Sequence, residues 1–407
     1  MVKAITSLAQ ITTVLCLLCP LRLAGARITE NLEVVKEGFT AGFNVLSVSR
    51  LAETGDNVVV FEDTTFRRSF LARVEETGQS PGSIRLEGVT EIPALDEFVN
   101  FGLLADVDED QQTELLLLTN RFLYVCSLNP STLREVQVRV RWGLYGRVGT
   151  ASQLDSNEVM RPGSPLSTRP FTERGYLIAV GDVTNNGSNE ILVSAHAGRT
   201  QHGFSFVRVI LLSYKNEELN PQLNFLAPAE GWEGLQVIDF DGDGHNEIVV
   251  PSYHVINFRR FNSALADLDV GMARLELYPN LAGQRVYFVG MSSLSPPSLV
   301  LLHVVSQAKQ RSTMAVGREV VVFGISPATR HLFGAAGFLG PAQLTPEELA
   351  RNAVWVDSTQ LQKQRTLKLS RTGADQPVRF RHLLALPMGG SNNPIILNTA
   401  LGFFLFR

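Results

Sequence analysis

Cysteine, tryptophan and charge are all scarce in this sequence, and each scarcity narrows the class of protein. The 407-residue chain has three cysteines and three tryptophans, and charged residues make up 19% of it, below the ~25% of an average soluble protein. Its 36 Lys+Arg stand against 40 Asp+Glu, so no basic excess marks a nucleic-acid surface and no nucleic-acid partner is expected. A hydrophobic fraction of 44% argues against disorder, and the composition excludes collagen and coiled coil. What remains is a globular chain long enough to bury a large core.

Long hydrophobic runs are also missing, apart from a compact one at the N-terminus. Residues 1–26 have the pattern of a secretory signal peptide, with Lys3 in the positive region, an apolar run at Ile11–Leu18 and a small-residue cleavage site at Ala24–Ala26. We therefore expect a secreted protein, or one in the lumen of the secretory pathway, with no transmembrane span in the mature chain. The stretch contains no acidic residue, so a mitochondrial presequence is the alternative. An uncleaved anchor is a third reading, although the run is short for ~30 Å of hydrocarbon.

The few cysteines exclude a disulfide framework in the mature chain. Cys16 and Cys19 lie within the predicted signal peptide, which leaves Cys126 alone. Cys126 lies in an apolar run, so the sequence predicts a buried and inert thiol.

The main feature of the sequence is an internal repeat. In each clear copy an apolar run leads into an acidic loop, and two further apolar runs follow. The three clear copies are Phe101–Val125, Tyr176–Ala195 and Gly234–Phe261. Two weaker copies, Leu46–Leu71 and Val286–Val305, keep the rhythm without the acids.

The repeat predicts an all-β fold. Short runs rich in Val, Ile, Leu, Phe and Tyr between turn residues are typical of strands, and four-stranded units at this period are typical of β-propeller blades. Seven blades are favoured, with six as the alternative, and residues 27–407 then form a single domain. The chain ends are expected to share one blade through Leu401–Arg407 and Leu32–Gly38. A degenerate unit is expected between residues 325 and 380, and a short helix at Leu344–Asn352.

The loop after Ile238 has the strongest metal-binding pattern. Carboxylates alternate at its first, third and fifth positions, Gly244 supplies a sharp reversal at the sixth, and a glutamate at the ninth can close the shell. Several hard oxygens in flexible geometry suit Ca²⁺ better than Mg²⁺. A solvated acidic turn is the alternative. The expected ligands are Asp239, Asp241, Asp243, the backbone carbonyl of His245, and Glu247.

Two other loops carry weaker versions of the pattern. The second expected set is Asp106, Asp108, Asp110, Gln112 and Glu114. There Gln111 replaces the glycine, at roughly 1 kcal/mol if its φ is positive. The third loop lacks two of the acids and is expected to bind weakly or not at all; its positions are Asp182, Thr184, Asn186, Ser188 and Glu190. Asn186 also begins an N-glycosylation sequon, and a glycan would remove it as a ligand.

The alternating acidic loop between strands of a ~55-residue repeat resembles the FG-GAP/VCBS family, which includes the head propeller of integrin α subunits. The resemblance covers nearly all of the chain after residue 26, although only three loops carry motif residues. It implies a calcium-binding propeller in which the metals are structural, each tying a strand pair at the rim of a blade.

The function that we expect is therefore a non-catalytic module for protein–protein interaction or adhesion. The segments that we expect to be exposed and to contact a partner are the insertion Ser156–Pro170 and the segment Gln307–Ser312. No phosphate-binding loop, nucleophile elbow or zinc motif is present in the sequence. A carbohydrate-binding propeller is one alternative, although the three tryptophans do not recur in register. A calcium-dependent polysaccharide lyase is another. If residues 1–26 are a presequence, the chain is a subunit of an organellar membrane complex.

Overall fold

The computed structural model describes the backbone of a series of strand-rich segments. These segments are residues 32–34, 39–41, 43–51, 53–63, 66–76, 84–95, 97–144, 175–199, 205–228, 235–239, 244–252, 255–261, 268–276, 284–292, 298–305, 317–324, 354–357, 362–368, 380–385, 395–399 and 402–406. Side chains are described over residues 45–51, 53–63, 66–75, 86–95, 97–144, 177–195, 208–223, 235–239, 244–250 and 260. The predicted signal peptide, Ser156–Pro170, Gln307–Ser312 and the helix at Leu344–Asn352 lie outside the described residues.

The described residues form six β-sheets, and the predicted all-β class is confirmed. Sheet 1 has the order β1-β6-β5-β4-β3, and sheets 2 and 3 have the orders β10-β9-β8-β7 and β11-β12-β13-β14. Their strands are β1 (Leu32–Val34), β3 (Phe43–Arg50), β4 (Asn57–Asp63), β5 (Arg68–Glu76), β6 (Ile84–Glu91), β7 (Phe101–Ala105), β8 (Glu114–Leu118), β9 (Phe122–Asn129), β10 (Arg134–Gly143), β11 (Gly175–Gly181), β12 (Glu190–Arg199), β13 (Ser205–Lys215) and β14 (Glu218–Pro228).

Sheets 4, 5 and 6 complete the described fold. Their orders are β15-β16-β17-β18-β22, β19-β20-β21-β23 and β2-β26-β25-β24. Their strands are β15 (Gln236–Ile238), β16 (Glu247–Ser252), β17 (Val255–Phe261), β18 (Leu268–Glu276), β22 (Val354–Asp357), β19 (Gln284–Ser292), β20 (Ser298–Val305), β21 (Gly317–Gly324), β23 (Gln362–Lys368), β2 (Phe39–Ala41), β26 (Gly402–Phe406), β25 (Ile395–Thr399) and β24 (Phe380–Ala385).

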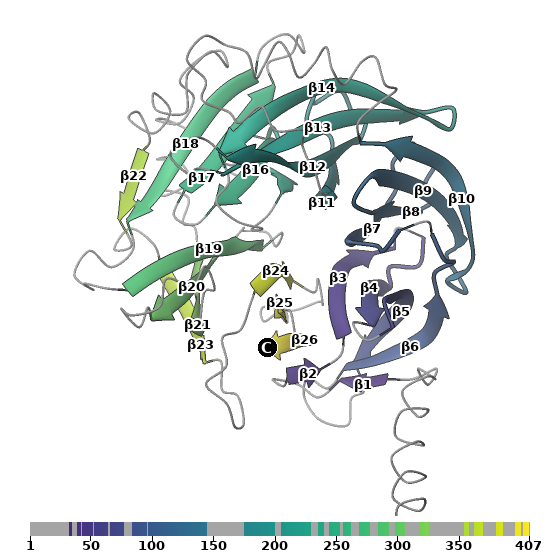
Figure 1. Ribbon diagram of the computed structural model, residues 1–407, viewed down its shortest axis with the longest axis horizontal. Helices are drawn as coiled ribbons and strands as arrows, with labels where there is room; N and C mark the ends of the chain where they lie inside the picture. The colour runs from purple at the N-terminus through teal and green to yellow at the C-terminus, as the bar shows by residue number, and fades with distance from the viewer. Residues whose placement is uncertain are drawn as a thin grey trace, which may run out of the picture.

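The sheets follow one another in chain order around a common region, as Figure 1 shows. Strand β3 contacts β7, β7 contacts β11, β11 contacts β15, β16 contacts β19, and β24 contacts both β19 and β3. Neighbouring sheets come very close at two glycines: a Cβ atom on Gly102 of β7 would lie 2.7 Å from Cγ1 of Val60 in β4, and one on Gly181 of β11 would lie 2.6 Å from Cγ1 of Val237 in β15. Glycine at these positions lets neighbouring sheets approach.

The core lies between the sheets, and the leucine run of β8 explains how it forms. Successive side chains of a strand point to opposite faces. Leu116 and Leu118 pack in a cluster with residues of sheets 3 and 4, whereas Leu115 and Leu117 pack in a cluster with sheet 1. All four are 0% exposed. A strand that is apolar on both faces needs a neighbouring sheet on each side, which is why the apolar runs of the sequence do not alternate with polar residues.

The two ends of the chain meet in sheet 6, but not through the predicted pair of segments. The C-terminal strand β26 pairs with β2, in which Phe39 lies opposite Phe404 and Ala41 opposite Gly402. The predicted partner Leu32–Gly38 instead contributes β1, which pairs with β6 in sheet 1. The sequence therefore located the closing C-terminal strand and missed its partner by a few residues.

The interval from 325 to 380 was expected to hold a degenerate unit. Its described strands are instead outer strands of two sheets: β22 pairs in parallel with β18, and β23 pairs with β21. Cys126 is buried in β9, and burial raises the pKa of its thiol to about 12. The predicted burial of this cysteine is confirmed.

Candidate metal centre

Three equivalent loops lie on one rim of the molecule. Each joins the first and second strands of a sheet: β7 to β8 in sheet 2, β11 to β12 in sheet 3 and β15 to β16 in sheet 4. We name them the second, third and fourth loops after their sheets. We call this edge the acidic rim. The turn between β3 and β4 of sheet 1, which contains Glu53 and Gly55, lies at the same edge because it joins the same pair of strands.

One hydrogen bond recurs in all three loops. The carboxylate of the first residue accepts a bond from the backbone N–H five residues later. The three donor–acceptor distances are 3.1 Å from Gln111 N to Asp106 Oδ2, 2.9 Å from Gly187 N to Asp182 Oδ2, and 3.0 Å from Gly244 N to Asp239 Oδ2. The first aspartate therefore has a structural role as the acceptor that closes each turn.

The sixth position of each loop has a left-handed backbone. The φ angle is 67° at Gln111, 89° at Gly187 and 90° at Gly244. Glycine adopts this conformation without steric cost, whereas a residue with a Cβ atom does not. Gln111 therefore meets the condition under which its replacement of glycine is costly, and the second loop is strained at this position where the other two loops are not.

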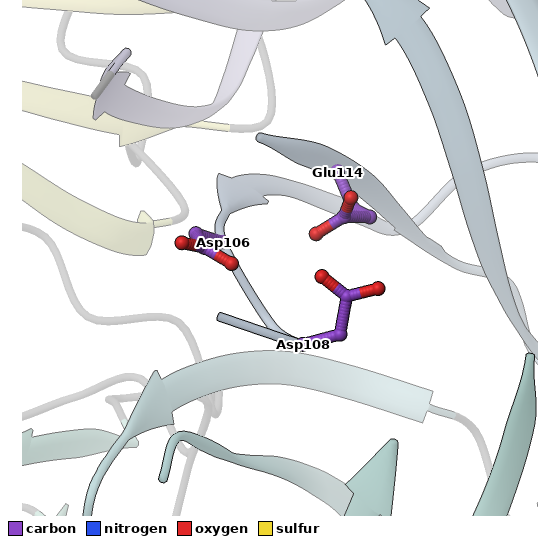
Figure 2. A group of neighbouring side chains, drawn as sticks. All are labelled: Asp106, Asp108 and Glu114. Carbon is purple, nitrogen blue, oxygen red and sulfur yellow. The ribbon is translucent and has the colours of Figure 1, made fainter. Parts of the chain in front are cut away.

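The second loop brings three of its five predicted ligands together. Ligand oxygens of Asp106, Asp108 and Glu114 all lie within 4.8 Å of one another, so this group could hold a metal ion. Figure 2 shows the carboxyl groups of Asp108 and Glu114 facing each other, with Asp106 beside them. Glu114 comes from the start of β8, is buried, and accepts a 3.1 Å hydrogen bond at Oε2 from the backbone N–H of Val107.

The other two predicted ligands of this loop bond to each other instead. Asp110 Oδ1 accepts from the backbone N–H of Gln112 at 2.7 Å, and Asp110 Oδ2 accepts from Gln112 Nε2 at 3.0 Å. Both side chains are exposed, and neither belongs to the three-residue group.

The electrostatics of the cluster favour a cation. Burial, followed by the charges of Asp108, Asp110 and Asp106, raises the pKa of Glu114 to about 7, against a hydrogen bond from Val107 that lowers it. Burial and the neighbouring carboxylates also raise the pKa of Asp108. Like charges held this close resist full ionisation, and a bound cation relieves that repulsion. Three hard carboxylate oxygens fit Ca²⁺ or Mg²⁺ in ligand type.

The third loop keeps the same turn, with a hydroxyl in place of one of the three carboxyl groups. Thr184 stands where Asp108 does, and its hydroxyl donates a 2.9 Å hydrogen bond to Glu190 Oε1. The backbone N–H of Val183 donates to Glu190 Oε2 at 3.0 Å. The buried glutamate is therefore satisfied by a hydroxyl and an amide, although burial still raises its pKa. Asn186 is exposed and accepts a 2.7 Å bond at Oδ1 from Ser188 N.

The fourth loop, which has the strongest sequence pattern, is described only in part. Asp239 holds the turn through Gly244, His245 is exposed, and Glu247 is buried at the start of β16. Asp241 and Asp243 lie outside the described residues.

The loops are also tied to one another, a feature that the sequence analysis missed. Asn189 Nδ2 donates to the backbone carbonyl of Asp106 at 2.9 Å, and Asn246 Nδ2 donates to that of Asp182 at 2.8 Å. The equivalent residue of the second loop, Thr113, donates through N at 2.6 Å and Oγ1 at 2.7 Å to the carboxylate of Glu53 in sheet 1. The sequence does contain a sign of these bonds between loops, since a residue with a hydrogen-bonding side chain recurs at the eighth position of each loop.

Comparison of the sequence with protein-family models and with curated proteins finds no match. The resemblance to the FG-GAP/VCBS family therefore has no matching family model behind it.

Solved structures with a similar arrangement include propeller domains. The chain is similar to BBS1N from its crystal structure in complex with ARL6DN, at 12% identity and a TM-score of 0.39 over 93% of this chain and 97% of that one. It is similar to a chain of the humanized mutant Chaetomium thermophilum Polycomb Repressive Complex 2, at 9% identity and a TM-score of 0.41 over 94% and 97%. The rhamnogalacturonan lyase YesX matches at 12% and 0.34 over 74% and 58%. Identities and TM-scores this low add nothing to the argument about site or function.

Gln111→Gly should stabilise the protein by roughly 0.5–1 kcal/mol, because the relief of left-handed strain exceeds the entropy that glycine adds to the unfolded chain. Urea unfolding in the presence of chelator measures the change. Gln112→Gly, at the next position of the same loop, is the matched control and should not stabilise. Equal effects of the two changes would contradict the strain at Gln111.

The stability of the metal-free protein should depend on pH through Glu114. Its pKa is about 7 in the folded state against 4.5 for the free side chain, so the folded protein binds the proton more tightly. The stabilisation is complete below about pH 4.5 and is lost as the pH rises through about 7. Urea unfolding across this range, with chelator, measures the slope.

Glu114→Gln should flatten this pH dependence, because a neutral amide does not titrate. Glu91→Gln, at an exposed carboxylate, is the control and should keep the wild-type slope. Calcium should remove the decline at high pH in the wild type, since the ion binds the ionised carboxylate. An unchanged slope in Glu114→Gln would assign the titration to another group.

Proposed function

We propose that this chain is a non-catalytic, calcium-binding β-propeller of the FG-GAP type that acts as a protein-interaction or adhesion module. The proposal includes secretion or residence in the lumen of the secretory pathway, on the pattern of residues 1–26. The observation that carries the calcium assignment is the Asp106, Asp108 and Glu114 cluster, held in a turn of the same hydrogen-bonded form as two neighbouring loops.

Six blades fit the described strands better than the seven favoured by the sequence. Six sheets are present in the described residues, and the inner strands of sheets 1 and 6 are in contact. The span that was expected to supply a further unit contributes outer strands to sheets 4 and 5. In the proposed six-bladed ring, the sheet shared by the two chain ends closes the propeller through the pairing of β2 with β26.

Calcium is the proposed ion at two loops. The side chains of Asp106, Asp108 and Glu114 supply carboxylate oxygens at the second loop, with Asp110 and Gln112 as the further ligands expected from the sequence. At the fourth loop the proposed ligands are Asp239, Asp241, Asp243, His245 and Glu247. The third loop is proposed to remain metal-free, because Thr184 and Val183 already satisfy Glu190.

A structural role suits the arrangement of the loops. Each acidic loop is hydrogen-bonded to the loop of the preceding sheet, so an ion that orders one loop also stabilises a contact between sheets. Extracellular calcium modules typically bind at about 10⁻⁴ to 10⁻³ M, which suits a secreted protein in millimolar calcium.

A non-catalytic role is supported by the causes of the perturbed pKa values in the described part. Three of the groups with a raised pKa belong to the acidic rim: Glu114, Glu190 and Asp108. The pKa values of the buried Cys126 thiol and of Tyr214 are raised chiefly by burial. Burial alone would raise the pKa of Glu97, but its bonds to Arg121 and the charge of that residue lower it. Loop geometry, packing and ion pairing account for each of these pKa shifts without a reaction.

The part of the chain that the structure describes contains no helix of the length and apolarity that a membrane span requires.

Calcium should raise the melting temperature and a chelator should lower it. Asp108→Asn and Asp241→Ala should each remove much of this response, because each takes a carboxylate from a proposed site, whereas Asp182→Ala should change it much less. Differential scanning fluorimetry with calcium, magnesium and chelator measures the response. Thr184→Asn is a neutral control in the third loop. No response to calcium in the wild type, or equal responses in all variants, would contradict the assignment.

The interaction role predicts that the native protein carries a defined companion in fixed ratio. Native mass spectrometry after mild purification from the source tests this, and peptide coverage shows where the mature chain begins and whether Asn186 carries a glycan. A protein that comes away alone and binds polysaccharide in calcium would instead support the carbohydrate-binding or lyase alternative. Co-purification with an organellar membrane complex, without cleavage after Ala26, would support the mitochondrial alternative.

A further inference from the structure

The rim opposite the acidic loops carries a cluster of arginine and phenylalanine side chains. Strands β4 and β8 run away from the acidic rim, so the turns after them, the segment between β6 and β7, and the end of β10 meet at the opposite edge of sheets 1 and 2. We call this cluster the arginine–phenylalanine surface. It comprises Phe66, Arg67, Arg68, Phe98, Arg121, Phe122 and Arg141.

Five cation–π contacts lie at this edge. Arg67 lies 5.0 Å above the ring of Phe98, and Arg68 lies 5.6 Å above that of Phe66. Arg68 also lies 5.7 Å above the buried Phe70. The ring of Phe122 lies 5.5 Å from Arg121 and 3.9 Å from Arg141. Such contacts occur roughly once in 70–80 residues, so this clustering is well above the density of an ordinary surface.

The rings are also unusually exposed. Among the described side chains only three large hydrophobic residues are exposed, and two of them, Phe66 at 44% and Phe98 at 54%, belong to this surface. Aromatic and arginine side chains together are the composition typical of interface centres and of the residues that dominate binding energy. It is the clustering of these residues that indicates an interface, because single exposed hydrophobic residues are common on any surface.

The charge that this surface presents to solvent is positive. The side chain of Arg67 is 51% exposed whereas that of its partner Glu62 is 3% exposed, and the side chain of Arg121 is 60% exposed whereas that of its partner Glu97 is 13% exposed. The carboxylates therefore lie beneath and hold the guanidinium groups, which face outward. Glu91, paired with Arg68 at 3.2 Å, is the exposed exception among the described acids of the cluster.

The arginines are held in place before any partner arrives. A guanidinium that stacks on a ring and bonds to a carboxylate has lost much of its rotamer freedom, so binding costs less conformational entropy. Arg67 also has a left-handed backbone, with φ 56°, and its N–H donates to Asp63 O at 2.8 Å. That conformation is unfavourable for arginine, and asparagine or glycine would fit it better.

We propose that the arginine–phenylalanine surface is a docking site for an acidic peptide segment of a partner protein, with an aromatic or large aliphatic residue as its anchor. The inference rests on the proposed interaction function and names the site and the chemistry of the partner. Carboxylates of the segment bind Arg67, Arg121 and Arg141, and the anchor packs on Phe66 and Phe98. Opposite charges at such a rim steer association and select the partner.

The test uses the full mature protein and labelled peptides in fluorescence anisotropy. The first peptide alternates Asp and Glu around a central Phe-Leu pair. Two matched peptides replace either its acids by Asn and Gln or its Phe-Leu pair by Ser. The acidic–aromatic peptide should bind about tenfold more tightly than either matched peptide, which corresponds to ~1.4 kcal/mol, and its affinity should fall with added salt.

Arg67→Asn tests the cationic part of the site. The change suits the left-handed backbone but removes the ion pair with the buried Glu62, so its two effects on the melting temperature oppose each other, whereas the affinity for the acidic–aromatic peptide should fall about fivefold or more. Phe98→Ser should lower the affinity similarly, because it removes a ring on which the anchor packs. It should change the melting temperature little, because that ring is 54% exposed and supports little of the fold. Arg134→Asn is the matched control, since Arg134 is exposed at the other end of the strand that carries Arg141, and it should leave the affinity unchanged.

Three outcomes would overturn the proposal. One is equal binding of the three peptides, and another is an affinity that Arg67→Asn and Phe98→Ser leave unchanged. The third is binding to phosphatidylserine vesicles, lost in the same variants, with no peptide preference. A native companion that stays bound to the Arg67→Asn, Phe98→Ser double variant would refute this site while leaving the interaction function intact. The absence of any companion and of any peptide binding would refute both.

Discussion

The structure depends on the burial of both faces of each sheet against neighbouring sheets. Leu115 to Leu118 of β8 pack alternately into two different clusters, one shared with sheet 1 and one with sheets 3 and 4. A single sheet of this composition would expose one apolar face, so neighbouring sheets must pack against it, as in other repeat architectures. The chain ends are joined in a different way. Strand β2 pairs with β26 in sheet 6, and this pairing holds together two ends that would otherwise separate.

The same packing aligns the acidic loops on one rim and lets them bond to one another. Each loop joins the first and second strands of its sheet, so the eighth residue of one loop comes within hydrogen-bonding distance of the first residue of the preceding loop, as Asn189 and Asn246 demonstrate. The turns keep one form whatever their acid content. In the second loop Asp108 faces Glu114, and a bound cation would relieve the repulsion between the two carboxylates. In the third, Thr184 replaces the aspartate and bonds to the glutamate directly.

The two rims therefore differ in how their charges are used. On the acidic rim the side chains are engaged in closing turns and linking sheets, and carboxylates gather where Asp106 and the exposed Asp108 meet the buried Glu114. On the opposite rim the carboxylates Glu62 and Glu97 are largely covered and hold arginines that face solvent beside exposed rings. A scaffold with one rim fixed by internal bonds and the other displaying preorganised cations is physically consistent with a binding module.

The sequence by itself determined the strands, the repeat and the loop positions, because hydrophobic runs and turn residues are local signals. It also showed that Gln111 stands where the other two loops have glycine, so that a positive φ there would be costly, and the structure supplied that φ angle. Only the tertiary structure decided that Asp110 and Gln112 bond to each other, that Thr113 reaches Glu53 of another sheet, and that Phe39 lies opposite Phe404. These contacts join residues whose neighbourhood is created by sheet packing, and the arginine–phenylalanine surface arises in the same way from segments of two sheets that no local pattern connects.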